Sequence, residues 1–263
     1  MASATKDVPA LFPRGLRRIG RFLFEWAPLI IVGALWEAAS GRLVDERMFP
    51  PPSEVLYQVY TQFAHEDLFN QLGISLYRVA VGLGLSITVG VMLGIGMARL
   101  RSVENFFDIF LAMLYPIPKA GLVPLAILWF GRGTDMAIFI IFLACLLPIV
   151  LNSYNAALAV DQSLIWSAKM MGTSDRQLLW KIILPDAIPQ IMTGVRQSIP
   201  IAFIALTGAE FLGSPDGVGA VIIFENQLGN YSRAFAAIVV ISATAFLALQ
   251  LFDRLQHRVI KWT

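Results

Sequence analysis

The stretch from Leu72 to Met97 reads LGISLYRVAVGLGLSITVGVMLGIGM, and Arg78 is its one charged residue. A run of this kind can cross a hydrocarbon core of about 30 Å, which takes about 20 apolar residues. Gly90 and Gly94 within it favour close helix approach. The whole chain of 263 residues is similar, with 57% hydrophobic and 14% charged residues and a mean hydropathy of +0.69. The sequence therefore predicts a membrane protein.

Five further apolar blocks also predict membrane spans, some of them interrupted. The six predicted spans are Phe22 to Ala39, Leu72 to Met97, Phe106 to Phe130, Met136 to Ala157, Ile188 to Leu212 and Phe235 to Phe252. Lipid satisfies no backbone hydrogen bond, and the runs lack the alternation of barrel strands, so the spans should be helices. We expect an all-α membrane protein with one six-helix domain, residues 22–252, between tails of residues 1–21 and 253–263.

The lysines and arginines predict the orientation, because short cytoplasmic loops carry an excess of both. With a cytoplasmic N-terminus, thirteen of them lie on the inner side: Lys6, Arg14, Arg17, Arg18, Arg21, Arg99, Arg101, Lys169, Arg176, Lys181, Arg254, Arg258 and Lys261. The outer side has four, Arg42, Arg47, Arg132 and Arg233. Both termini should therefore be cytoplasmic. The net charge of +2 then reflects topology and not nucleic-acid binding.

The predicted cytoplasmic loop from Ala159 to Asp186 is long for a small membrane protein, which suggests that it has a function. Its first part predicts a short helix. Asp161 or Ser163 can cap the start of this helix, and Gly172 suits the left-handed position that ends it.

The second part of the loop predicts another short helix. Ser174 and Gln177 form a capping box at its start, and Pro185 should mark its end. One face is apolar and holds Leu178, Leu179, Ile182 and Ile183. Such a pair of helices suits docking into a groove of another protein, although an amphipathic helix that lies on the membrane would show the same pattern.

The spacing of Ala168, Gly172 and the segment Ile182-x-Leu184-Pro185 resembles the cytoplasmic signature of importer permeases of the ATP-binding-cassette class. In that family the loop is a coupling helix that sits in a cleft of the ATPase subunit. The family usually begins the signature with glutamate and two alanines, where this chain has Trp166, Ser167 and Ala168. The resemblance implies an ATPase-docking surface made by Trp166, Ser167, Ala168, Gly172, Ile182, Leu184 and Pro185. Its first position would make an apolar contact and not a salt bridge.

The likeness extends over nearly the whole chain. The segment YPIPKAGLVPLAILWFG at residues 115–131, the segment EFLG at residues 210–213 and the segment GVG at residues 217–219 resemble one branch of the family. That branch imports nitrate, bicarbonate, taurine and alkanesulfonates. The resemblance implies a permease of a bacterial inner membrane that forms the path for a small solute, an anion such as nitrate, bicarbonate or a sulfonate. Aromatic or heterocyclic solutes, which other relatives carry, stay an alternative.

The resemblance also implies the partners. Two copies of the chain would form one path, each would dock a separate ATPase subunit, and an extracytoplasmic solute-binding protein would deliver the solute. ATP and magnesium would bind the partner ATPase, and no cofactor would bind this chain.

The third predicted span cannot be an ordinary helix, because Pro116, Pro118, Gly121 and Pro124 interrupt it. Non-helical backbone at membrane depth is tolerated where it is buried in protein or lines a cavity. We therefore expect this stretch to face the translocation path, with a packed kink as the alternative.

Ionisable side chains within the spans need compensation, since a charge at the bilayer centre costs about 2.5 to 3.5 kcal/mol on insertion scales. Lys119 lies in the interrupted span, and Glu210 is a candidate carboxylate for it or for the path. Contact of Lys119 with solute and pairing with a carboxylate are both open. For Arg78 and Arg196 we expect side chains that reach toward the interface.

The sequence lacks the usual catalytic motifs. It has no phosphate loop of the Gly-x-x-x-x-Gly-Lys-Ser/Thr type, no Gly-x-Ser-x-Gly nucleophile motif and no Cys/His cluster for zinc. Cys145 should be a packed thiol. We therefore expect a transport subunit and not an enzyme. The alternative is a stand-alone secondary transporter or channel, which would not need the cytoplasmic signature; a membrane scaffold is disfavoured by the interrupted span.

Overall fold

The computed structural model describes residues 27, 28 and 30–259 of the chain. Within them the regular structure is helical, apart from an isolated bridge between Ser40 and Val44. The α-helices are Ile30–Ala39, α2 (Pro52–His65), α3 (Leu68–Arg99), α4 (Arg101–Leu114), α5 (Val123–Phe130), α6 (Thr134–Ala159), α7 (Gln162–Met170), α8 (Asp175–Leu178), α9 (Leu184–Gly213), α10 (Val218–Gln227) and α11 (Tyr231–Val259). A 3₁₀ turn, Lys119–Leu122, precedes α5, and a π-helical turn, Leu179–Ile183, joins α8 to α9.

The chain divides into two compact units, residues 1–57 and 58–263. In the first, the helix Ile30–Ala39 is tied to the segment that leads into α2. Trp36 Nε1 donates to the carbonyl of Pro50 at 3.0 Å, and Ser40 Oγ donates to the carbonyl of Phe49 at 2.7 Å. The Glu37 carboxylate accepts the backbone N–H of Ser53 at 3.1 Å, which satisfies a free donor at the start of α2.

Among the described residues, four helical stretches are long and apolar enough to cross a membrane: α3, α8 through α9, α6 and α11. The pair α4 and Lys119–Phe130 makes a fifth if counted as one bent span. These five match the second to sixth predicted spans. Residues 22–26 and 29 of the first predicted span lie outside the described residues, and the rest holds the short apolar helix Ile30–Ala39. The count of six spans therefore stays a prediction.

In the second unit, α3, α6 and α9 pack closely because glycines face neighbouring helices. A Cβ atom on Gly94 would lie 2.5 Å from the carbonyl oxygen of Val150, and one on Gly90 would lie 2.8 Å from Ile149 Cγ2. Gly194 of α9 meets Asn152 of α6 in the same way, at 2.7 Å. The close approach expected from Gly90 and Gly94 is confirmed, and Cys145 is buried in the same core, as expected.

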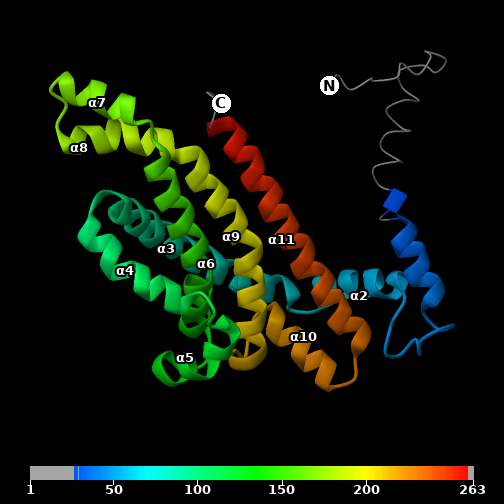
Figure 1. Cartoon of the computed structure of the whole chain (residues 1–263). Helices are drawn as coiled ribbons and strands as arrows, with labels where there is room; N and C mark the ends of the chain where they lie inside the picture. Colours follow the sequence, from blue (N-terminus) through cyan, green and yellow to red (C-terminus); the bar gives the residue numbers. More distant parts are fainter. Residues whose placement is uncertain (1–26, 29, 260–263) are drawn as a thin grey trace, which may run out of the picture. The chain divides into compact units, whose positions relative to one another are not determined.

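The ends of this unit differ in what they carry. Figure 1 shows the pair α7 and α8 at the same end as the last turns of α11, with α5 and α10 at the opposite end. The sites described below lie at both ends and are joined by the packed helices α3, α6 and α9.

The close packing predicts that Gly94→Ala destabilises the protein, whereas Gly84→Ala, where nothing lies within 4 Å of the added Cβ, does not. We expect a loss of about 1 to 3 kcal/mol for Gly94→Ala, typical of overpacking, because backbone of α6 cannot move away easily. Thermal unfolding of the two purified variants in detergent measures the difference. Equal melting temperatures would show that α3 and α6 do not pack in this way.

Candidate functional site

The helix pair α7 and α8 is held by the local interactions that the sequence predicts. Asp161 Oδ1 accepts the backbone N–H of Ser163 at 2.8 Å and caps α7; this hydrogen bond lowers the pKa of the Asp161 carboxyl. Gly172 has φ of +81°, the left-handed conformation that ends α7. Ser174 and Gln177 form the capping box of α8. These predictions of helix, break and helix are confirmed.

One face of the pair is buried in a small core of its own. Ala168, Leu178 and Ile183 are 2%, 0% and 0% exposed. They pack with Ile165 of α7 and with the end of α6, beside partly buried residues at the end of α3. The pair is therefore packed against the span helices and is not a loose loop.

The other face exposes large apolar side chains. Trp166 of α7 is 66% exposed, and Met170, one turn later in the same helix, is 89% exposed. Exposed apolar groups close together mark a surface that meets a partner or lipid. Of the predicted docking residues, Trp166, Ser167 and Gly172 are exposed, Ala168 is buried, and Ile182, Leu184 and Pro185 are half-buried. Only the first three of these are thus well exposed.

The prediction that Pro185 ends the second helix is wrong. The helix continues from α8 through the π-helical turn Leu179–Ile183 into α9, in which Pro185 occupies the first turn. Proline lacks a backbone N–H and clashes with the carbonyl four residues before it. The wider π turn lies just ahead of Pro185 and shifts the hydrogen-bond ladder, which allows the helix to pass through.

The interrupted third span is bent by 92° between α4 and the segment Lys119–Phe130. The predicted break is confirmed, and Pro116, Pro118, Gly121 and Pro124 are all exposed in the described chain. Lys119 is half-buried, and its Nζ donates to the carbonyls of Leu114 and Tyr115 at 2.9 and 3.0 Å. An ammonium group there caps the free carbonyls at the end of α4.

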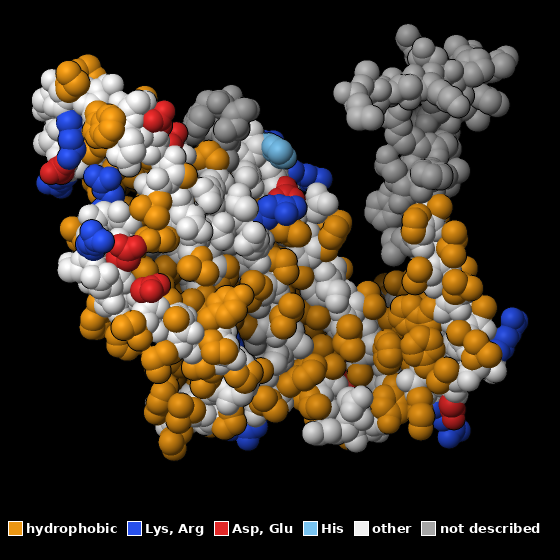
Figure 2. Space-filling view, viewed as in Figure 1, with side chains coloured by type: hydrophobic (Ala, Val, Ile, Leu, Met, Phe, Trp, Pro, Cys, Tyr) orange, Lys and Arg blue, Asp and Glu red, His pale blue; other side chains and the backbone are white. Residues whose placement is uncertain are grey.

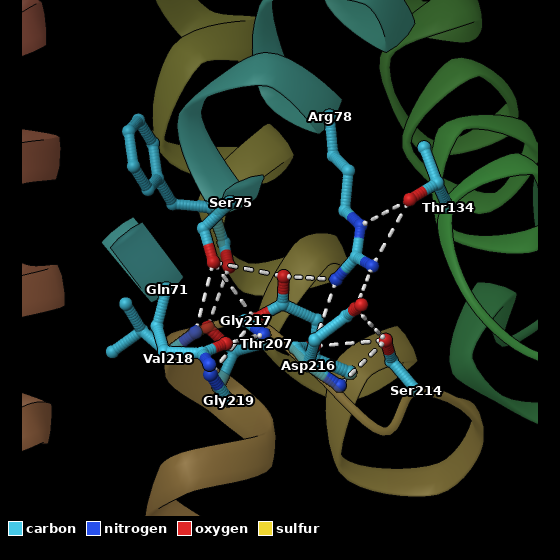
Figure 3. Close-up of polar contacts among 12 residues, drawn as sticks. Gln71, Ser75, Arg78, Thr134, Thr207, Ser214, Asp216, Gly217, Val218 and Gly219 are labelled. Carbon is cyan, nitrogen blue, oxygen red and sulfur yellow. Dashed lines mark hydrogen bonds and ion pairs between the residues drawn. The ribbon is translucent and has the colours of Figure 1, made fainter. Parts of the chain in front are cut away.

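The sequence left open whether Lys119 pairs with Glu210, and in the structure the two residues do not pair. Glu210 is fully buried and binds Arg78, with Arg78 Nη1 at 2.8 Å from Glu210 Oε1 and neither side chain exposed. Arg78 belongs to α3 and Glu210 to α9, and Figure 3 shows the Arg78 side chain pointing from α3 toward Asp216. We expected Arg78 to reach toward the membrane interface and Glu210 to line the path. In the structure, both side chains are instead buried against each other.

The same cluster holds the loop between α9 and α10 against α3. Arg78 also donates to the Asp216 carbonyl at 2.9 Å and forms an ion pair with the Asp216 carboxylate. Three backbone N–H groups of this loop donate hydrogen bonds to buried or half-buried side chains. The N–H of Gly217 donates to Gln71 at 2.6 Å, that of Val218 to Ser75 at 2.9 Å and that of Gly219 to Glu210 at 2.8 Å. We call Gln71, Ser75, Arg78, Glu210 and Asp216 the polar clasp. Its donors and acceptors satisfy one another, as buried polar groups require.

Sequence reasoning missed the polar clasp. Arg78 and Glu210 were visible as ionisable residues in spans, and such residues usually pair with one another. Arg78 and Glu210 are 132 positions apart in the chain, and the predicted spans hold three cations and several carboxylates, so the sequence did not determine which of them pair. No group of His, Cys, Asp and Glu that could hold a metal ion occurs in the described part of the chain.

The polar clasp predicts that Arg78→Gln costs about 3 to 5 kcal/mol, because it leaves the Glu210 carboxylate buried without its cation. Arg78→Gln/Glu210→Gln should recover part of the loss. The control is Arg196→Gln, which removes an exposed pair with Asp253 and should cost at most about 1 kcal/mol. Unfolding of the detergent-solubilised variants measures all three; equal losses for Arg78→Gln and Arg196→Gln would contradict the clasp.

Known proteins resemble this chain in sequence and in fold. A Bacillus subtilis (strain 168) protein named an aliphatic sulfonates transport permease is 31% identical over 99% of this chain and 97% of its own length. The taurine transport system permease protein of Escherichia coli (strain K12) is 29% identical over 89% of this chain and 86% of its own length.

Among solved structures, inward-facing conformations of the MetNI methionine ABC transporter match with a TM-score of 0.60, 18% identity and coverage of 80% of this chain and 97% of that chain. A bacterial ABC transporter for import of the acidic polysaccharide alginate matches with a TM-score of 0.62, 16% identity and 94% coverage of both chains. These identities are low, so the two structures support the fold alone. Residues 86–261 match the family described as the binding-protein-dependent transport system inner membrane component. The chain belongs to this family, and it is a permease subunit of an ATP-binding-cassette importer.

Proposed function

We propose that two copies of this chain form one translocation path for a small sulfonate anion, and that each copy docks an ATPase subunit through α7 and α8. The observation that carries the proposal is the helix pair itself. It is anchored by a buried core on one face and exposes Trp166 and Met170. A rigid pair with an apolar outer face suits insertion into a groove of another protein.

The docking surface in this proposal has an apolar first position. Trp166 takes the place where the family usually has an acid, so its partner should be an apolar pocket of the ATPase. Aromatic side chains are frequent anchors at interfaces because they bury a large area with few rotatable bonds. Ser167, which follows Trp166 directly, and Gly172, which lies just after α7, are also exposed.

The ATPase would bind ATP and magnesium and would move α7 and α8 when it closes. The pair lies between α6 and α9 in the chain, and both helices pack against α3. A displacement of the pair would therefore also move α6 and α9, which pack against α3. Alternating access then requires two arrangements of the permease that the ATPase states stabilise differently. An extracytoplasmic solute-binding protein would deliver the solute.

The orientation that we propose puts both termini and the loop 159–186 in the cytoplasm, with six spans in residues 22–252. Arg99, Arg101, Lys169, Arg176 and Lys181 lie in the loops and helix ends around α7 and α8. Their concentration there agrees with the bias of lysine and arginine toward cytoplasmic loops.

Sulfonate is the proposed solute because two relatives are named for aliphatic sulfonates and taurine. The bent third span would contribute to the path through Pro116, Pro118, Lys119, Gly121 and Pro124. Lys119 has no carboxylate partner among the described residues and binds two carbonyl groups. Its positive charge is therefore available to attract a passing anion.

The docking proposal predicts that Gly172→Val uncouples transport from ATP hydrolysis, because valine strains a left-handed position by about 1 to 3 kcal/mol and distorts the helix pair. The matched control is Gly229→Val. Gly229 has φ of +77° against +81° for Gly172, and neither has an atom within 4 Å of an added Cβ. We expect stimulation of the ATPase and copurification with it to fall for Gly172→Val alone. Wild-type stimulation by Gly172→Val would contradict the docking surface.

The solute proposal predicts uptake of taurine or a short alkanesulfonate by proteoliposomes that contain the permease, its ATPase and its binding protein. Lys119→Gln should lower this uptake roughly tenfold, which corresponds to about 1.4 kcal/mol, and leave the melting temperature nearly unchanged. Arg132→Gln removes an exposed charge beside the same bent span and should leave uptake unchanged. Uptake of a neutral heterocycle but no sulfonate would refute the solute class, and equal uptake by the two variants would remove Lys119 from the path.

A further inference from the structure

A groove of about 870 Å³ lies between the end of α3 and the segment that runs from α8 into α9. Its lining is mostly apolar and includes Val91, Met92, Ile95, Leu179, Trp180 and Leu184. Met92 is 71% exposed and Trp180 60%, so these apolar side chains have no cover in the described chain. A surface of this kind calls for an apolar occupant.

Basic side chains also line the groove: Arg99 at the end of α3, Lys169 at the end of α7 and Arg176 in α8. The one acidic lining residue, Asp175, forms an ion pair with Lys169 at 3.4 Å. Arg99 and Arg176 have no hydrogen bond or ion pair from their side chains to any described residue. Figure 2 shows Lys and Arg side chains beside exposed hydrophobic ones on the lobe that carries α7 and α8. The groove thus combines an apolar lining with two unpaired guanidinium groups.

Lipid headgroups meet a span helix near its ends, and the groove lies at one end of α3. Arg99 is the last residue of the apolar span α3, and Val91, Met92 and Ile95 lie one to two turns deeper in the same helix. Guanidinium groups bind phosphate with strong, charge-assisted hydrogen bonds. Basic pockets between span helices on the cytoplasmic side are suited to anionic lipid headgroups, and anionic lipid is abundant in that leaflet.

We propose that this groove is a binding site for one anionic phospholipid. The phosphate would bind Arg99 and Arg176, and an acyl chain would lie along Val91, Met92 and Ile95. The lipid would then contact both the end of α3 and α8, and so would support the helix pair from beneath. The proposal relies on the proposed function only for the choice of leaflet.

A protein occupant is the competing explanation. A second copy or the ATPase would have to supply both an apolar segment and an anionic group to satisfy the same lining. A lipid carries both in one molecule, and Val91, Met92 and Ile95 of the lining belong to α3, a helix long and apolar enough to cross a membrane. The test therefore measures lipid binding on the purified permease alone and copurification of the ATPase separately.

The experiment is native mass spectrometry of the permease titrated with phosphatidylglycerol or with phosphatidylcholine of the same acyl chains. Arg99→Gln/Arg176→Gln is compared with Arg101→Gln/Arg254→Gln, which removes the same charge from exposed positions outside the groove. Each basic residue near anionic lipid contributes about 1 kcal/mol, so we expect the groove variant to bind phosphatidylglycerol roughly 30-fold more weakly. The control variant and the binding of phosphatidylcholine should be unchanged.

Several results would overturn the proposal. Equal weakening in the two double variants would mean that the lipid binds by net charge and not in the groove. Displacement of phosphatidylglycerol by inorganic phosphate at equal concentration would mean that the site takes a free anion. Loss of ATPase copurification in the groove variant, with lipid binding intact, would assign the groove to the ATPase. Because lipid binding is measured on the permease alone, its failure leaves the docking proposal untouched.

Discussion

The arrangement of the second unit depends on the need to neutralise charge where lipid offers no water. Arg78 and Glu210 lie in two different span helices and are both fully buried. Each would be costly alone, and together with Ser75 and Asp216 they satisfy their hydrogen-bonding groups. The pair therefore fixes α3 against α9 and holds the loop that leads into α10. Glycine contacts between α3 and α6 complete a three-helix core with little room for adjustment.

This core gives the helix pair α7 and α8 a rigid base. The pair lies between α6 and α9, and Leu178 of α8 and Ile183 of the π-helical turn are buried beside the end of α3. A partner that displaces the pair must therefore move packed helices and not a loose loop. The proposed lipid groove, lined by Arg99 and Arg176, lies beside the same helix pair, so a bound lipid would contact α8.

Much of this could be predicted because it depends on local chemistry. Hydropathy located the second to sixth predicted spans. The caps at Asp161 and Ser174 follow from side chains that bond to nearby backbone, and Gly172 follows from the left-handed conformation that glycine adopts readily. The partner of Arg78 could not be predicted, since pairing depends on how distant helices pack. Nor did the sequence signal the π turn before Pro185 or the helices α2 and α10, which are too short to appear as spans. The bend at Lys119 was predictable, but its carbonyl partners were not.

In the proposed arrangement, the pair α7 and α8 faces the cytoplasm and docks the ATPase. The most direct measurement is labelling of Ser163→Cys, in a Cys145→Ala background, with a thiol reagent that does not cross membranes. Ser163 is exposed at the start of α7. We expect labelling in inverted membrane vesicles, no labelling in intact cells, and protection when the ATPase is bound. Labelling in intact cells, or equal labelling with and without the ATPase, would contradict it.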